Sequence, residues 1–174
     1  MSIIDHGRII ILLYIMTTKR DLRYFQGKIV SCGRMIRTLL VDDEHGLCEI
    51  TRIFLERSGN ITVDTALSPK IAYQKMAREH YDVIISDYEM PEMNGIEFLK
   101  GLRAANNTIP FIIFTGRGSA EVATEALDNG ADFYLQKKGD PREQYRKLQN
   151  MLLQAVKLRR PMHEILAGIE GRYE

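Results

Sequence analysis

Short apolar runs alternate with amphipathic stretches along most of this chain. The runs are rich in β-branched residues and lie at residues 38–41, 61–66, 83–86, 109–115 and 132–135. The middle runs lack the polar–apolar alternation of a half-exposed strand, which favours strands covered on both faces. We therefore expect five strands, most of them buried inside a sheet.

Helical periodicity fills the segments that follow these runs. Apolar residues recur at helical spacing in five groups: Leu47, Ile50 and Phe54; Ala72, Tyr73 and Met76; Phe98, Leu99 and Leu102; Val122, Ala123, Ala126 and Leu127; and Tyr145, Leu148, Leu152, Ala155 and Val156. Ser68-Pro69 and Asp140-Pro141 are typical helix starts. Five strand–helix units over residues 36–160 predict an α/β fold, with helices on both faces of a five-stranded parallel sheet.

The first 35 residues differ from the rest in charge and pattern. They hold six lysines and arginines against two aspartates, a net charge of +4, whereas the whole chain carries +1. Their one apolar run, residues 9–16, is shorter than the about 20 helical residues that span a bilayer. We expect a disordered leader, a short amphipathic appendage, a functional anchor, or translation assigned from too early a start, with Met35 as the true one. Residues 161–174 form a short C-terminal tail.

Composition narrows the class of protein. Hydrophobic residues make up 45% and charged residues 27%, as in ordinary globular domains. A net charge of +1 recruits neither nucleic acid nor an anionic membrane. Two cysteines make a disulfide scaffold implausible and exclude a four-cysteine zinc site. We expect a cytoplasmic globular domain.

Complementary polar groups follow four of the five predicted strands. The first strand ends in Asp42-Asp43, the third in Asp87, the fourth in Thr115, and the fifth in Lys137. In an open parallel sheet, ligands bind beyond the carboxyl ends of the strands. We expect these side chains to form one site.

Charge balance indicates what this site can hold. Carboxylates brought close together repel one another unless a cation joins them, and Mg²⁺ prefers oxygen ligands. If Asp87 were converted to an acyl phosphate, Thr115 and Lys137 could each donate a hydrogen bond to the added oxygens. Phosphoryl transfer depends mainly on positioning and on neutralising spread charge, and this set offers both.

The chain resembles the response-regulator receiver domain of two-component signalling over about 125 residues. Four ordered motifs carry the resemblance: the segment ending in Asp42-Asp43-Glu44, residues 82–95 around Asp87, residues 113–116 with Thr115, and residues 130–137 with Lys137. The resemblance implies the flavodoxin-like, doubly wound (βα)5 fold. It also implies that the protein is a switch that catalyses only its own phosphorylation and dephosphorylation.

The resemblance assigns roles to individual residues. Asp87 would accept a phosphoryl group from a sensor histidine kinase or a histidine phosphotransferase. Asp43 and Asp87 would bind Mg²⁺ directly, Asp42 through water, and Glu89 through its backbone carbonyl. Thr115 and Lys137 would hold the phosphoryl oxygens. Thr115 and Tyr134 would form the switch that remodels the output surface, which includes residues 122–127 and 140–158.

Two features depart from the family pattern. The family usually has proline after the lysine, with a cis bond, whereas this chain has Lys138. A non-proline cis bond costs about 3–4 kcal/mol, so we predict a trans Lys137–Lys138 peptide. Glu89 and Arg117 lie two residues after Asp87 and Thr115, and we expect them to be able to pair across the entrance.

Several functions remain open at this point. Only about 14 residues follow the last predicted helix, so we expect no DNA-binding or catalytic output domain. The output would be docking onto an unknown downstream protein, phosphate relay, or competition as a phosphate sink, and a homodimer through the output surface is possible. The alternatives are a Mg²⁺-dependent phosphatase or phosphotransferase that acts on a small substrate, and a receiver-like module that docks constitutively.

Overall fold

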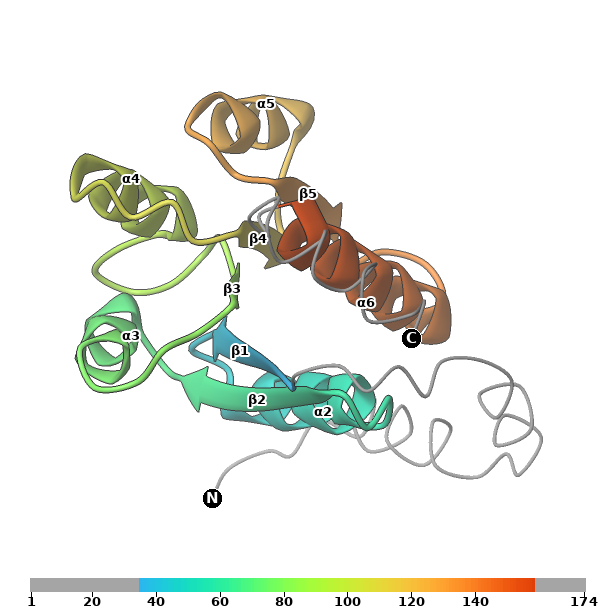
Figure 1. The fold of residues 1–174 in the computed structure, drawn as a ribbon. Helices are drawn as coiled ribbons and strands as arrows, with labels where there is room; N and C mark the ends of the chain where they lie inside the picture. Colours follow the sequence, from blue (N-terminus) through green and yellow to red (C-terminus); the bar gives the residue numbers. More distant parts are fainter. Residues whose placement is uncertain (1–34, 159–174) are drawn as a thin grey trace, which may run out of the picture.

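Five parallel strands form one sheet in the computed structural model, which describes residues 35–158 (Figure 1). In chain order they are β1 (Ile36–Val41), β2 (Ile61–Ala66), β3 (Val83–Ser86), β4 (Phe111–Thr115) and β5 (Phe133–Gln136). Their order in the sheet is β2-β1-β3-β4-β5. The predicted leader apart from Met35, the predicted tail, and the last two residues of the predicted domain lie outside the described residues.

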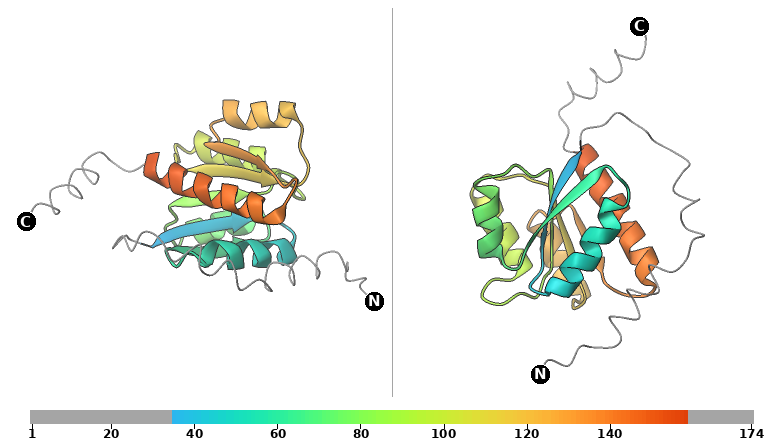
Figure 2. Two further views of the ribbon diagram at one scale, coloured as in Figure 1. Left: turned by 90° about the vertical axis from the view of Figure 1, so that its right-hand side faces the viewer. Right: turned by 90° about the horizontal axis from the view of Figure 1, so that it is seen from below.

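A helix follows each strand, and the helices cover both faces of the sheet. They are α2 (His45–Glu56), α3 (Pro69–Met76), α4 (Gly95–Ala104), α5 (Ala120–Asp128) and α6 (Pro141–Leu158). Figure 2 shows α2 and α6 on one face and α3 and α4 on the other. The predicted fold class is confirmed. No helix within residues 35–158 is long and apolar enough to cross a bilayer.

The sheet separates two apolar layers, and the side chains of successive residues in a strand point alternately into one layer and the other. On β4, Ile112 and Phe114 pack with residues of α2 and α6, whereas Phe111 and Ile113 pack with residues of α3, α4 and α5. All five residues of β4 are buried. The sequence of β4 does not alternate between polar and apolar residues because neither face of the strand is exposed to solvent.

Side-chain caps fix where the helices begin. The Ser68 hydroxyl accepts a hydrogen bond from the Ile71 N–H at 3.3 Å, and the Asp140 carboxylate accepts one from the Arg142 N–H at 2.8 Å. Asn94 and Glu97 form a reciprocal capping box at the start of α4. This box, which ends the loop that follows Asp87, was not predicted from the sequence.

Three strands have boundaries that differ from the predicted ones, and the first of them, β1, begins at Ile36 rather than at residue 38. β4 begins at Phe111 rather than at residue 109, because Pro110 has no N–H to donate to a ladder. β5 begins at Phe133 and ends at Gln136, each one residue later than predicted. The Asp132 carboxylate accepts a hydrogen bond from the Phe111 N–H at 2.9 Å. Asp132 therefore bonds to the start of β4 through its side chain.

Two predicted inward-facing helix residues are exposed. Tyr73 on α3 is exposed, although the edge of its ring contacts Phe98, with 5.0 Å between the ring centroids. Leu127 on α5 is half exposed, since α5 fully buries only the small Ala126. On α6, by contrast, all five predicted inward-facing residues are buried.

The buried hydroxyl of Thr38 gives a direct test of this packing. Thr38 is fully buried in β1, and its Oγ1 has no hydrogen-bond partner within residues 35–158. Thr38→Val removes this unpaired group while keeping a similar shape. We expect the free energy of unfolding to rise by about 1 kcal/mol, measured by chemical denaturation.

Thr51→Val is the matched control for this prediction. Thr51 is also buried, but its side chain shares a hydrogen bond with Tyr145. Its replacement is expected to lower stability, because the Tyr145 hydroxyl loses a partner. Equal losses in both variants would contradict the packing described for Thr38.

Candidate functional site

The site lies at the carboxyl ends of the strands, where the direction of strand addition reverses between β1 and β3. Asp42 follows β1 and Asp87 follows β3. The Asp87 N–H donates a hydrogen bond to the Val41 carbonyl at 2.8 Å, which brings the two carboxylates onto adjoining chain segments. Thr115 ends β4 and Lys137 follows β5, as predicted. This is the expected position for a ligand site in a doubly wound sheet.

Lys137 joins the two central carboxylates. Its Nζ donates to the Asp42 Oδ2 at 2.8 Å and to the Asp87 Oδ1 at 3.3 Å. The side chains of Lys137, Asp42 and Asp87 are 15%, 6% and 12% exposed. The structure thus brings three of the predicted site residues into one largely buried charge cluster.

Two further hydrogen bonds hold Asp42 in place. Its Oδ1 accepts a hydrogen bond from the Glu44 N–H at 2.8 Å, and its carbonyl oxygen accepts one from the Cys48 thiol at 3.3 Å. Burial raises the pKa of Cys48 to about 12, with Asp42 adding to the effect. The thiol therefore stays protonated and serves as a core donor.

The cluster alters the acidity of its members. Burial raises the pKa of Asp87 above its usual value and the Asp42 charge adds to the shift, although Lys137 and a hydrogen bond with Thr115 oppose it. For Lys137, burial favours the neutral amine. The charges and hydrogen bonds of Asp42 and Asp87 outweigh burial, so the pKa of Lys137 is raised. Lys137 therefore remains a cation. Its charge is not sufficient to bring the pKa of Asp87 back to the usual value.

The two predicted switch residues border this cluster. Thr115 is fully buried, and its Oγ1 donates to the Arg117 carbonyl at 2.8 Å and accepts from the Arg117 N–H at 3.2 Å. Tyr134 on β5 is partly buried. Burial raises the pKa of its hydroxyl, and the nearby Tyr88 and Asp87 contribute.

The donor set fits a hard cation such as Mg²⁺. Asp42 and Asp87 supply carboxylate oxygens, whereas Asp43 is exposed beside them. Within residues 35–158, no group of three or more His, Cys, Asp and Glu side chains is arranged to hold a metal ion. Mg²⁺ sites, however, commonly use one or two carboxylates together with waters and phosphate oxygens. The metal roles of Asp42, Asp43, Asp87 and the Glu89 carbonyl stay predictions.

Both predicted departures appear at the edge of the site. Residues 35–158 contain no cis peptide bond, so the Lys137–Lys138 peptide is trans, as predicted. Arg117 Nη1 lies 3.2 Å from Glu89 Oε2, so the expected pair forms. Because the Arg117 side chain is 83% exposed, this pair contributes little to stability.

Gly95 is a site residue whose role the sequence analysis missed. A Cβ atom built on Gly95 would overlap the Asp87 carbonyl oxygen and lie 3.2 Å from the Ile113 Cδ1. Its N–H also donates to the Tyr88 carbonyl at 2.9 Å. Gly95 therefore lets the first turn of α4 pack directly against the backbone of Asp87. The residue was part of a quoted motif, but only the structure shows this contact.

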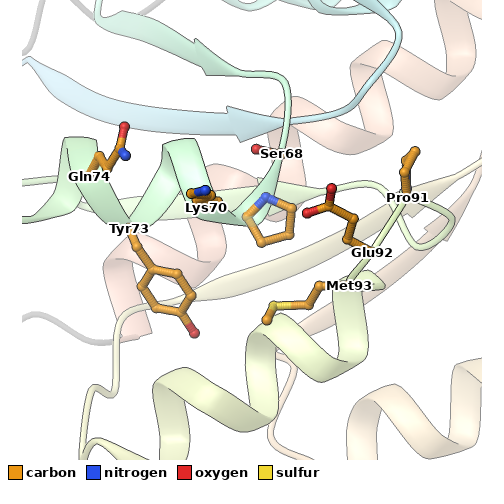
Figure 3. A pocket seen from close by; sticks show the side chains of 8 residues that line it. Ser68, Lys70, Tyr73, Gln74, Pro91, Glu92 and Met93 are labelled. Carbon is orange, nitrogen blue, oxygen red and sulfur yellow. The ribbon is translucent and has the colours of Figure 1, made fainter.

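A separate cavity of about 550 Å³ opens between the start of α3 and the loop that follows β3 (Figure 3). Its lining residues are Ser68, Pro69, Lys70, Tyr73, Gln74, Pro91, Glu92 and Met93. None of the predicted site residues lines it. The cavity is therefore distinct from the charge cluster.

Comparison with known proteins agrees with this geometry. The model of the response regulator receiver domain matches residues 38–149. Response regulator Rre1 of Synechocystis is 35% identical over 119 residues, which cover 67% of this chain and 52% of that protein. The chain therefore spans about half the length of this curated relative.

Solved receiver structures show the same fold. The receiver domain of the Francisella response regulator 1452 has a TM-score of 0.65 and 30% identity, covering 72% of this chain and 99% of that one. Chemotaxis protein CheY4 of Vibrio cholerae has a TM-score of 0.60 and 32% identity, covering 67% and 98%. The chain belongs to the response regulator receiver family of two-component signalling, whose members are signalling switches.

The raised pKa of Asp87 predicts a gain in stability when its charge is removed. In the folded protein this pKa lies above the ordinary value of 3.8, so folding disfavours the charged carboxylate. The penalty is complete above the raised pKa, shrinks as pH falls through it, and is gone below the unfolded-state value. Asp87→Asn should therefore raise the free energy of unfolding at neutral pH, and the gain should vanish in acid.

Denaturant unfolding of the wild type and of Asp87→Asn, measured from neutral pH down into acid, checks the prediction. Asp43→Asn is the matched control, because Asp43 is the adjacent carboxylate and is exposed; its effect should be smaller. An Asp87→Asn protein that is less stable than the wild type at neutral pH would contradict the charge balance described for Lys137.

Proposed function

We propose that this protein is a cytoplasmic phosphorylatable switch in which Asp87 accepts a phosphoryl group. The donor is the phosphohistidine of a sensor histidine kinase or a histidine phosphotransferase. The phosphorus–nitrogen bond breaks, a bond forms between phosphorus and an Asp87 carboxylate oxygen, and the imidazole leaves with the nitrogen electron pair. The observation that supports this proposal most directly is the buried Asp87 carboxylate, which follows a central strand and lies 3.3 Å from the Lys137 ammonium.

Lys137 and Thr115 supply the donors that the product needs. Phosphorylation changes the charge on the Asp87 side chain from −1 to about −2. The Lys137 ammonium, already directed at the Asp87 Oδ1, can turn to a phosphoryl oxygen while Asp42 still holds it. The Thr115 hydroxyl donates to the Arg117 carbonyl oxygen, and a phosphoryl oxygen on Asp87 would take the place of that acceptor.

Mg²⁺ is the cofactor that these residues suit. Asp43 and Asp87 would hold it directly, Asp42 through water, and Glu89 through its backbone carbonyl. Bound there, Mg²⁺ supplies positive charge that offsets the charge spread over the transferring phosphoryl group. The raised pKa of Asp87 supports this role, because Lys137 alone does not supply enough positive charge to offset the effect of burial and Asp42 on that carboxylate.

The output surface would be formed by α5, β5 and α6, with Thr115 and Tyr134 as the switch. α5 fully buries only Ala126, which is typical of an element that can move at low cost. Its exposed Leu127 offers apolar area to a partner. The partner would be an unidentified downstream protein or, in a homodimer, a second copy of this surface. Such docking needs neither nucleic acid nor membrane.

The loops at the strand ends argue against a small-molecule phosphatase. Three residues separate β1 from α2, four separate β4 from α5, and the longest of these connections, between β3 and α4, has eight. Within the described residues, no cap or lid covers the Asp87 carboxylate and excludes water from a small substrate. A site with short loops suits a protein donor that brings its own phosphohistidine.

Intact mass spectrometry tests the proposed function. The full chain is incubated with Mg²⁺ and a small acyl phosphate, and we expect a single phosphoryl adduct that a chelator abolishes. Asp87→Asn should show no adduct. The exposed Asp128 on α5 provides a matched control, since Asp128→Asn should be modified like the wild type.

The alternative functions predict different results. Turnover of the small phosphodonor that far exceeds the amount of protein, with no adduct, would indicate a hydrolase. Absence of both the adduct and Mg²⁺ binding in the folded protein would indicate a receiver-like module that docks constitutively. An adduct that survives Asp87→Asn would contradict the assignment of the phosphoacceptor.

A further inference from the structure

The Tyr134 hydroxyl is buried and, within residues 35–158, has no hydrogen-bond partner. The ring packs against the apolar layer that faces α3, α4 and α5. A buried hydroxyl that has lost its water and gained no partner raises the free energy of the folded state. This inner position of the ring therefore depends on other contacts around the hydroxyl.

Gly118, in the loop between β4 and α5, provides the space that this hydroxyl occupies. A Cβ atom built on Gly118 would overlap the Tyr134 Oη and lie 3.2 Å from its Cζ. The backbone of Gly118 is outside the left-handed region, so its conformation alone would accept other residues. The glycine is required here by the ring and not by the turn.

Gln136 holds the same loop from β5. Residues two apart on a strand point to the same face, so Gln136 and Tyr134 lie on one side of β5. The Gln136 Nε2 donates a hydrogen bond to the Gly118 carbonyl oxygen. The strand therefore contacts Gly118 twice, through the ring of Tyr134 and through the amide of Gln136.

The loop is also bound to the phosphoryl-site threonine. The Thr115 hydroxyl shares two hydrogen bonds with the backbone of Arg117, the residue before Gly118, in addition to its hydrogen bond with Asp87. Thr115 is also in register with Gln136 in the β4–β5 pair. A shift of the Thr115 hydroxyl toward Asp87 would release Arg117 and with it the peptide that lies against Tyr134.

We infer that Gly118 and Gln136 are positioning residues that determine whether the Tyr134 ring lies inside or turns to solvent. Gly118 leaves room for the hydroxyl, and the Gln136 amide keeps the loop in the position that leaves this room. The inference rests on the proposed function only for its consequence, the shape of the output surface. Its geometric part concerns the unphosphorylated protein.

Fluorine NMR of the full chain labelled with 3-fluorotyrosine tests this inference without any phosphodonor. Tyr134→Phe identifies the resonance of Tyr134. Gly118→Ala should move that resonance to a solvent-exposed position, with the solvent isotope shift of an exposed ring. Gln136→Leu, which removes the amide donor, should move it part of the way in the same direction.

Gly116→Ala is the matched control in the same loop. A Cβ atom there meets only the Lys137 Cδ, at 3.9 Å, so the Tyr134 resonance should not change. A Gly118→Ala resonance at the wild-type position, or an equal shift in Gly116→Ala, would overturn the inference. If Gly118→Ala does not fold, an unshifted resonance in Gln136→Leu overturns it and a shifted one supports it. Failure of Asp87 to be phosphorylated would refute the proposed function and leave this result unaffected.

Discussion

Lys137 donates hydrogen bonds to both Asp42 and Asp87, and this three-charge contact joins the ends of β1, β3 and β5. The parallel order of the strands forces the two carboxylates close together, since the backbone of Asp87 bonds directly to Val41. Without the ammonium group, burial and the Asp42 charge would raise the pKa of Asp87 further. The Lys137 Nζ also lies 5.1 Å from the centroid of the Phe114 ring, so the core below the site helps to place the cation.

The two sides of the site differ in how firmly the backbone around them is held. On the fixed side, the capping box of Asn94 and Glu97 and the close contact of Gly95 hold the backbone after Asp87 in place. On the other side, the Thr115 hydroxyl forms two hydrogen bonds to the loop backbone at Arg117, and α5 fully buries one small side chain. A charge added at Asp87 would therefore be accommodated by displacing the loop between β4 and α5. This asymmetry is what a switch between two populated states requires.

Much of this arrangement follows from patterns that act locally along the chain. Strand periodicity, helix caps and the polar residues that follow strands predicted the fold and placed Asp42, Asp87, Thr115 and Lys137 in one site. Contacts between distant segments could not be predicted in this way. The overlap of Gly118 with Tyr134 and the packing of Gly95 on Asp87 depend on distances that no periodicity encodes. Tyr73 and Leu127 were expected to face inward, but an apolar stripe does not reveal how much of it a neighbouring element covers.

The state of the Asp87 carboxyl is the most direct test of the charge balance around Lys137. Carboxyl carbon NMR of Asp87 would follow its titration first without metal and then with saturating Mg²⁺. We expect a pKa above the ordinary 3.8 without metal, because burial and Asp42 outweigh Lys137, and a lower pKa once Mg²⁺ adds positive charge. A carboxyl that titrates at its ordinary value in both conditions would contradict this description of the site.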